Sequence, residues 1–316
     1  MERDACCKYL PVGEDTDMAV RILTDSASDL SQEYAKKHGI EVIPLRVRFG
    51  ETEYLDGVTI TPEDFFRELE KKVLPKTSQI TPYQYDELFR AAADAGDEVV
   101  CICMSSGVSG TWQNACMAAE EYEGKVFVID SKQFCISEGI LALEAARMRD
   151  EGMSAREIAE KLEEDKGHAH VMSVFETLEY LRLGGRMTAA AAWVGGVLNL
   201  KPVLTIDEGV VHVLAKARGM KNGNMLMRKL SEKVGGIDWN RPVLLGYTGV
   251  SDSRLREYIE DCIASYGEKI KNLPIAKVGA CIGTYAGPGA IAIAFFDKNC
   301  AMRSGRRRTL WSGACS

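Results

Sequence analysis

The stretch Glu98–Ala115, EVVCICMSSGVSGTWQNA, changes character twice. From Val99 to Met104 it is a nearly continuous apolar run, the pattern of a strand buried on both faces in a parallel sheet. Small hydroxylated residues and glycines follow, and from Trp112 onward apolar residues recur at helical spacing. The stretch therefore predicts a strand, a hydroxyl-rich loop and a helix, the unit of an α/β fold. Such a loop can hold an anion on the free N–H groups of the helix start, although capping serines in a tight turn are the alternative.

Strands and helices alternate on both sides of this stretch up to about residue 167. This alternation predicts an α/β fold with a mostly parallel sheet covered by helices on both faces. Beyond His168 the pattern changes, and two strands that flank Gly209 predict a hairpin. We expect a flexible extension at 1–18, an α/β domain at 19–167, a smaller α+β domain at 168–297, and a basic, disordered tail at 298–316.

Composition limits the function. The chain has 316 residues and a net charge of −7, which gives no general argument for nucleic acid or an anionic membrane as partner. No P-loop motif is present, so we do not expect ATP chemistry from this chain alone. The 10 cysteines lack metal-ligand spacing, which favours reduced thiols in a cytoplasmic protein. The start lacks a signal-peptide pattern and the apolar run 189–198 is too short for stable membrane insertion.

Hydroxyl side chains gather in loops next to predicted strands and helices. Such clusters either cap the next element or contribute to a ligand site. Two of the clusters lie in a predicted loop before the helix that begins at Thr81 and in the loop of the opening stretch. The candidate residues are Thr77, Ser78, Ser105, Ser106 and Ser109.

Several motifs stand in the order seen in the DegV family, which the chain resembles over residues 19 to 297. They are TDSASDL (24–30), KTSQITP (76–82), SSGVSGTWQNA (105–115), DS (130–131), LEYLRLGGRM (178–187), KPVL (201–204) and GTYAGPGA (283–290). The resemblance implies a bacterial two-domain protein that holds a long-chain fatty acid in a tunnel. It also implies that this protein presents the carboxylate to a separate fatty acid kinase, with no cofactor, metal or catalytic residue of its own.

The fatty acid that the resemblance implies needs several hydrogen-bond donors for its carboxylate at the mouth of a dry cavity, and the candidate hydroxyl groups can supply them. The resemblance also ranks these residues. It makes Thr77 and Ser109 the strongest candidates for the carboxylate, and it matches Arg186 to an arginine near the head group, facing the product or the kinase. Family members often carry histidine where this chain has Tyr285. Tyrosine keeps a hydrogen-bond donor but cannot become a cation at neutral pH. We therefore expect fatty acid binding to persist and kinase coupling to be altered. The cavity wall is expected to include Trp193, Leu198 and Phe175, and Gly283, Gly287 and Gly289 to mark a tight turn.

Other functions remain as alternatives. One is a hydrolase or acyl-transfer enzyme that uses Ser109, although GVSGT lacks the second glycine of a nucleophile elbow. Another is nucleic-acid binding through the tail, which contains Trp311 and four arginines, Arg303, Arg306, Arg307 and Arg308. His168 and His170 could share a strand face as metal ligands. Asp25 and Asp130 could act in acid-base or metal chemistry, but an aspartate at a strand end more often caps the next helix.

Overall fold

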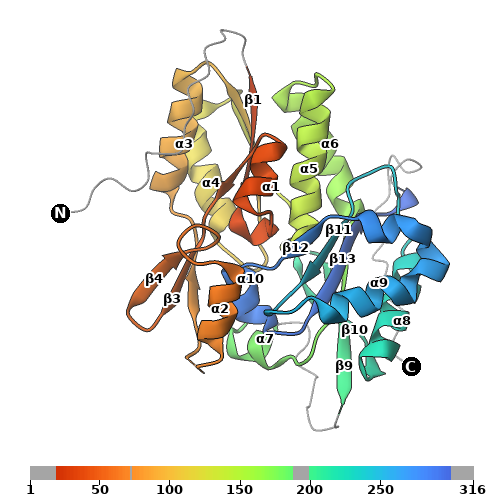
Figure 1. Ribbon diagram of the computed structural model, residues 1–316. Coiled ribbons are helices and arrows are strands. Elements are labelled where there is room, and N and C mark those ends of the chain that lie inside the picture. Colours follow the sequence, from red (N-terminus) through yellow and green to blue (C-terminus); the bar gives the residue numbers. More distant parts are fainter. Residues whose placement is uncertain (1–18, 72, 188–198, 300–316) are drawn as a thin grey trace.

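The computed structural model describes residues 19–71, 73–187 and 199–299. The predicted extension at 1–18, nearly all of the predicted helix at 187–197, and the tail from residue 300 onward lie outside the described residues. Two expected cavity residues, Trp193 and Leu198, also lie outside them. The described residues form three sheets and the helices that pack on them (Figure 1).

The first sheet is parallel, with strand order β2-β1-β6-β7. These strands are β1 (Val20–Asp25), β2 (Ile40–Ile43), β6 (Glu98–Cys103) and β7 (Val126–Asp130). Helices α3 (Pro82–Asp94) and α4 (Thr111–Ala119) cover one face, and α1 (Gln32–Lys37), α5 (Ile136–Asp150) and α6 (Ala155–Asp165) cover the other. Neighbouring residues of a strand point to opposite faces of the sheet, so Ile22 packs in the core on one face and Leu23 in the core on the other. The predicted α/β sheet with helices on both faces is confirmed.

The starts of several helices follow directly from the sequence. Thr81 and Gln84 form a capping box at the start of α3, and Ser154 and Glu157 form another at the start of α6. Thr61 caps α2 (Pro62–Leu69), which has proline in its first turn. These side chains satisfy backbone N–H groups that have no partner within the helix. The predicted helix starts at these positions are confirmed.

A small antiparallel sheet lies beside the first, with strand order β4-β3-β5. Its strands are β3 (Arg46–Phe49), β4 (Thr52–Leu55) and β5 (Lys76–Ser78). The prediction that Thr77 and Ser78 lie in a loop is therefore wrong, because both pair with β3. A strand of three residues is too short to show a periodic pattern in the sequence.

The second large sheet has six strands in the order β10-β9-β8-β13-β11-β12. Its hairpin turns at Glu208 and Gly209, which both have positive φ, so the predicted hairpin is confirmed. Helices α8 (Met220–Lys233) and α9 (Ser253–Tyr266) pack on one face. The strands are β8 (Ala169–Val174), β9 (Leu200–Asp207), β10 (Val210–Arg218), β11 (Leu244–Tyr247), β12 (Ile275–Lys277) and β13 (Ile291–Phe296).

Helix α5 lies between the two large sheets (Figure 1). Twelve of its 15 residues are buried, as expected for a helix that is covered on all sides. One hydrophobic core joins α5 to Ile22 and Val100 of the first sheet and to Val171 and Phe296 of the second. The predicted domain boundary near residue 168 falls in the short helix η3 (Lys166–His168) between α6 and β8. It stays a prediction, because α5 packs on both sheets.

Two short helices complete the part of the molecule that holds the candidate site. They are α7 (Glu179–Leu183) and α10 (Ala280–Ala286), which lie side by side. Helix α10 comes late in the chain but packs on α2, where a Cβ on Gly283 would lie 2.7 Å from Phe65. The prediction that Gly283 marks a turn is wrong, since it lies inside α10. Gly287 and Gly289 do have positive φ and form the predicted turn.

Candidate functional site

Three of the predicted site residues meet at the carboxyl end of α10. The Tyr285 hydroxyl lies 2.6 Å from Oγ1 of Thr77 on β5, and either group can donate the proton. The Arg186 guanidinium lies over the Tyr285 ring, 4.9 Å from its centre, and donates a hydrogen bond to the Gly184 carbonyl. Burial raises the pKa of Tyr285, so its phenol stays neutral and can donate. The cluster combines two hydroxyl groups with one guanidinium.

Two glycines allow α7 and α10 to approach closely. A Cβ on Gly184 would lie 2.4 Å from the Tyr285 ring, and a Cβ on Gly287 would lie 2.2 Å from the Tyr180 ring. Each helix therefore places an aromatic ring against a glycine of the other segment. This packing fixes where the Tyr285 hydroxyl points.

An apolar cavity of about 70 Å³ lies between the second large sheet and α10. Ile282 and Ala286 of α10 line it, and so do Phe134 and Phe175. These two phenylalanines also pack in the hydrophobic cluster that contains the Tyr285 ring. Phe175, which is expected in the wall of the acyl cavity, lines this cavity, and the cavity lies next to the hydroxyl cluster. The other lining residues come from β8, β9, β10, β11 and β13 and their flanking loops, from Cys135 before α5 and from Val278 after β12.

The hydroxyl-rich loop 105–110 lies beside β5. The Gln79 side chain is so close to Gly110 that a Cβ there would lie 2.2 Å from its amide oxygen. Asn114 donates a hydrogen bond of 2.7 Å to the Ile80 carbonyl. In the same loop, Ser109 is half-buried and accepts a hydrogen bond from the Thr111 amide. The structure thus brings the loop of Ser109 next to the strand of Thr77.

Ser105 and Ser106 already have partners inside the protein. The Ser105 hydroxyl is buried and donates to the Gly209 carbonyl at the tip of the β9–β10 hairpin. The Ser106 hydroxyl donates to Asp130 and accepts from Lys132 at 2.8 Å. Burial raises the pKa of Asp130, but hydrogen bonds from Lys132 and Ser106 outweigh it and lower the pKa overall. These two serines hold loops together, and nothing in the sequence identified Lys132 or Gly209 as their partners.

Ser78 lies on the other face of its strand from Thr77. Successive side chains of a strand point to opposite faces, and Thr77 points toward Tyr285. Ser78 is exposed. Of the predicted site residues, the structure therefore gathers Thr77, Tyr285 and Arg186, places the loop of Ser109 nearby, and separates Ser78 from them.

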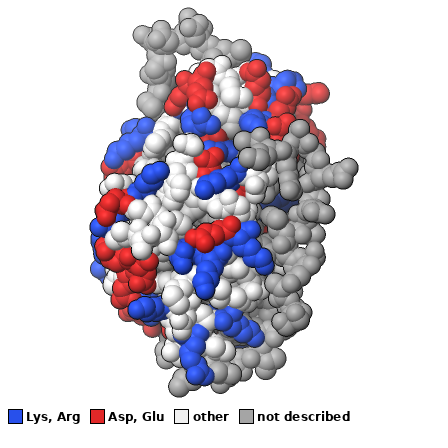
Figure 2. Space-filling model, turned by 90° about the vertical axis from the view of Figure 1, so that its right-hand side faces the viewer, with Lys and Arg blue, Asp and Glu red and all other residues white. Residues whose placement is uncertain are grey.

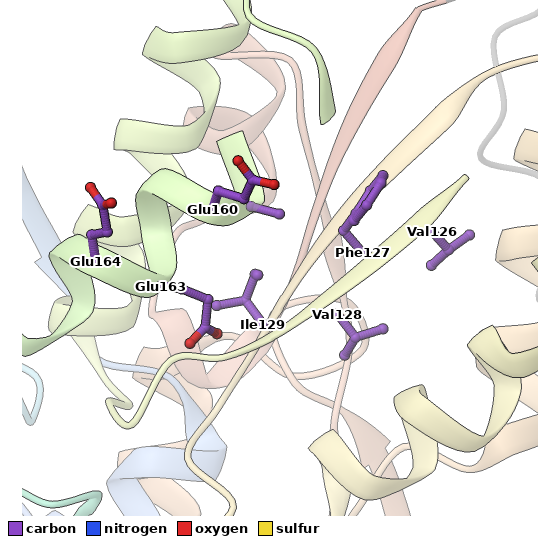
Figure 3. Close-up of a pocket in the computed structure, with 8 residues that line it drawn as sticks. Val126, Phe127, Val128, Ile129, Glu160, Glu163 and Glu164 are labelled. Atoms are coloured by element: carbon purple, nitrogen blue, oxygen red, sulfur yellow. The ribbon is translucent and has the colours of Figure 1, made fainter. Parts of the chain in front are cut away.

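A larger hollow lies elsewhere, between the edge strand β7 and α6 (Figure 3). It measures about 650 Å³ and is an open groove, lined by apolar residues of β7 and by Glu160, Glu163 and Glu164 of α6. Three carboxylates on one wall repel an anionic ligand. We therefore place the candidate site at the smaller cavity beside Tyr285.

His168, His170 and Asp25, which are candidates for acid-base or metal chemistry, have structural partners. His168 and His170 both hydrogen-bond to Asp297, and neither of them contacts Ser109. Asp25 caps the short helix η1 (Ser26–Ser28) by accepting from the Ala27 amide. Within residues 19–71, 73–187 and 199–299 no group of His, Cys, Asp and Glu could hold a metal ion. In the same segments no helix is long and apolar enough to cross a membrane.

The fold and site define a mixed α/β protein with an apolar internal cavity beside a cluster of hydroxyl groups. The model of the DegV family, described as an uncharacterised protein family, matches residues 19–298. A DegV domain-containing protein of Caldanaerobacter subterraneus is 36% identical over 281 residues, covering 88% of this chain and 99% of its own length. The chain belongs to the DegV family.

Solved structures of fatty acid-binding proteins have the same fold as this chain. A DegV family protein from Thermus thermophilus, described by its fatty acid binding, superposes with a TM-score of 0.80 at 31% identity, covering 88% of this chain and 100% of the other. A stearic acid-binding protein from Eubacterium ventriosum gives a TM-score of 0.78 at 28% identity, with 90% and 100% covered. The chain is similar over nearly its whole described length to structures that bind fatty acids.

Proposed function

We propose that this protein binds a long-chain fatty acid, with the acyl chain in the apolar cavity and the carboxylate at Thr77. The observation that carries the proposal is the hydrogen bond between Thr77 and Tyr285 at the edge of a cavity that α10 itself lines. A fatty acid has one apolar and one anionic part, and this site offers apolar walls next to neutral donors. The fatty acids of the similar structures support the same ligand class.

The hydrogen-bond directions follow from the number of protons. A threonine hydroxyl has a single proton to donate. If Thr77 donates to a carboxylate, Tyr285 must donate to Thr77, and its phenol is neutral for that purpose. Such a chain polarises the Thr77 hydroxyl and strengthens its bond to the anion. Ser109, in the neighbouring loop, is the proposed second donor.

The cavity volume sets a condition for binding. A volume of about 70 Å³ has room for only about two water molecules. Pockets that enclose drug-sized ligands measure about 300–1,000 Å³. A long acyl chain therefore enters only when lining side chains such as Phe134 and Phe175 move apart. Binding should be accompanied by rearrangement of these two rings.

The proposed role is that of a non-catalytic carrier in the cytoplasm that presents the carboxylate to a separate fatty acid kinase. Neutral hydroxyl groups hold the carboxylate without covering it with a buried cation, which leaves it open to attack. Arg186 is half-buried next to Tyr285, where it can contact a phosphorylated product or the kinase. Tyr285 cannot supply a cationic donor, so phosphorylation at this site depends on Arg186 and on the kinase.

The alternatives have less support. A hydrolase needs a base near Ser109, but Ser109 hydrogen-bonds to Thr111, and none of the four histidines, all in described segments, bonds to it. The arginines of the tail lie outside the described residues. On the face in Figure 2, Lys and Arg side chains occur together with Asp and Glu, unlike the one-sign surface typical of nucleic-acid binding.

The proposal is tested by purifying the protein from a bacterial host, denaturing it, extracting it with organic solvent and identifying the extract by mass spectrometry. The expected result is one fatty acid per protein molecule, and its length and unsaturation will define the preferred chain. An empty protein that also fails to take up added fatty acids would rule the proposal out.

Replacing Tyr285 with phenylalanine should weaken fatty acid binding about fivefold. The ring still packs on Gly184, but the proton that orients Thr77 is lost, at a cost of about 1 kcal/mol. Fluorescent fatty acid displacement measures the change in Kd. An unchanged Kd would mean that Thr77 does not need Tyr285 as a donor.

A further inference from the structure

Four buried carboxyl groups lie together at the amino end of α10. They are Asp25 at the end of β1, Asp29 after η1, Asp56 after β4 and Glu138 in α5, and their exposed fractions are 0, 6, 2 and 0%. They gather where the first sheet, α5 and the segment 279–281 meet. The proposed fatty acid site does not use any of them.

Asp56 and Asp25 have donors on both carboxyl oxygens. Asp56 accepts hydrogen bonds from the amides of Ala280 at 2.7 Å and Cys281 at 3.1 Å, and from the Ser26 hydroxyl. Asp25 accepts from the amides of Ala27 and Met104. Donors on both oxygens stabilise the ionised form of a carboxyl group.

Asp29 and Glu138 have a donor on one oxygen only. Asp29 accepts from the Gly279 amide at 2.8 Å, and Glu138 accepts from the Thr24 hydroxyl at 2.9 Å. The second carboxyl oxygen of each residue is buried and has no hydrogen-bond partner. The Ser28 hydroxyl is also buried without a partner. A buried anionic oxygen without a donor is very costly, whereas a protonated oxygen is neutral.

The described part of the chain places no basic partner beside the cluster of four carboxyl groups. Among the described residues, no lysine, arginine or histidine forms an ion pair with any of the four carboxyls. The other titratable groups that face it are acids: Cys103 on β6, Cys135 before α5, Cys281 on α10 and Tyr85 on α3. Burial raises the pKa of all four carboxyls, that of Asp25 to about 7, and the nearby carboxyls raise those of Asp25, Asp29 and Glu138 further.

We propose that Asp29 and Glu138 carry protons at neutral pH while Asp56 is ionised. The four carboxyl groups then form a binding surface for the amino end of α10, called here the seat of α10, and its strength depends on these protons. With both protons in place, one anion caps the amides of α10. When they are lost, the seat contains several unscreened negative charges and α10 is held less firmly. Because α10 carries Tyr285 and lines the cavity, its seating controls the position of the candidate site. This proposal does not depend on which ligand binds there.

The direction of the pH effect follows from proton binding. The folded protein keeps protons that the unfolded chain releases near the ordinary carboxyl pKa of about 4. Stability is therefore greatest below about pH 4 as far as this cluster is concerned, and it is lost as pH rises toward the raised folded pKa, about 7 for Asp25. A carboxylate paired with a base has the opposite effect, since its stabilisation is lost as pH falls below about 4.

Three single variants test the assignment. Asp29→Asn and Glu138→Gln replace a protonated carboxyl by a neutral group of the same shape, and Asp56→Asn replaces the ionised one. Urea unfolding is measured at about pH 5.5, pH 7 and pH 8.5. The wild-type midpoint is expected to fall as pH rises. Glu138→Gln and Asp29→Asn should exceed wild type by a margin that grows from the lowest pH to the highest, because the amides do not ionise in the unfolded chain, whereas Asp56→Asn should be weaker throughout.

Glu144→Gln is the matched control. Glu144 is as buried as Glu138 and lies in the same helix, but it pairs with Arg147 and Arg241. Its replacement should lower the midpoint at neutral pH. If Glu138→Gln behaves like Glu144→Gln, Glu138 is ionised and the proposal fails.

Two measurements on the wild type keep the proposal testable should a variant not fold. Infrared difference spectra recorded between about pH 5.5 and about pH 8.5 should show that protonated carboxyl groups are lost as pH rises. Amide hydrogen exchange of residues 279–286, corrected for its intrinsic pH dependence, should lose protection over the same range, while β6 does not. Spectra without a protonated carboxyl at neutral pH, or unchanged protection of α10, would overturn the proposal.

Discussion

Gly139→Ala is expected to lower the free energy of unfolding by about 3 kcal/mol. A Cβ at this position would lie 2.6 Å from the Ser28 carbonyl oxygen and 3.2 Å from Leu30, in the middle of the buried helix α5. The first of these is a backbone atom, and it belongs to a short helix fixed by buried hydrogen bonds. The clash can be relieved only by moving α5, which packs on both large sheets. Chemical denaturation followed by circular dichroism measures the loss.

Gly167→Ala is the control for this substitution. Nothing lies within 4 Å of a Cβ at Gly167, and its φ is not positive, so alanine should leave stability unchanged or raise it slightly. If Gly139→Ala were as stable as Gly167→Ala, the close approach of α5 to residues 28–30 would not exist.

The double variant Thr77→Val and Ser109→Ala is expected to lose its fatty acid. Each hydroxyl group is proposed to donate to the carboxylate, and a hydrogen bond to a charged group contributes about 1.5–3 kcal/mol. Two such losses weaken binding by about 100-fold or more. Solvent extraction and mass spectrometry of the purified variant should therefore find far less than one fatty acid per chain.

Ser78→Ala provides the matched control, because Ser78 neighbours Thr77 but points to the opposite face of β5. It should retain its ligand. A circular dichroism melt separates ligand loss from unfolding, since Ser109 also accepts a hydrogen bond at the start of α4. A folded double variant that retains a full complement of fatty acid would place the carboxylate elsewhere.

The first sheet could be predicted from the sequence because its signals are local. The apolar run at Val99–Met104 is long enough to identify a buried strand, and the capping side chains of Thr81 and Ser154 mark where helices begin. Both kinds of signal depend on neighbours within a few residues. They hold regardless of where the rest of the chain lies.

The parts that could not be predicted depend on distant contacts. Strand β5 pairs with an edge of β3, and position 283 holds glycine inside a helix because Phe65 and Phe66 leave no room for a side chain. Neither partner can be inferred from the residues themselves. A glycine looks the same in the sequence whether it forms a turn or a close contact.

The candidate site shows the same limit. The family resemblance named Thr77, Arg186 and Tyr285, yet only the structure shows the hydroxyls of Thr77 and Tyr285 2.6 Å apart. Serines in one loop are also alike in the sequence, but Ser105 and Ser106 hold loops together while Ser109 lies beside β5. The partner of a hydroxyl group is decided by the folded chain.

The seat of α10 has a consequence for how the protein is made. The chain leaves the ribosome from its amino end, so Asp29 and Asp56 emerge long before Gly279 and Ala280, whose amides donate to them. Until then these carboxyls lack the amides of α10, and in water a carboxyl ionises at its ordinary pKa of about 4. The newly made first half therefore lacks the partners of its own buried acids. It waits for a helix encoded near the other end of the gene, and proton uptake accompanies the final step of assembly.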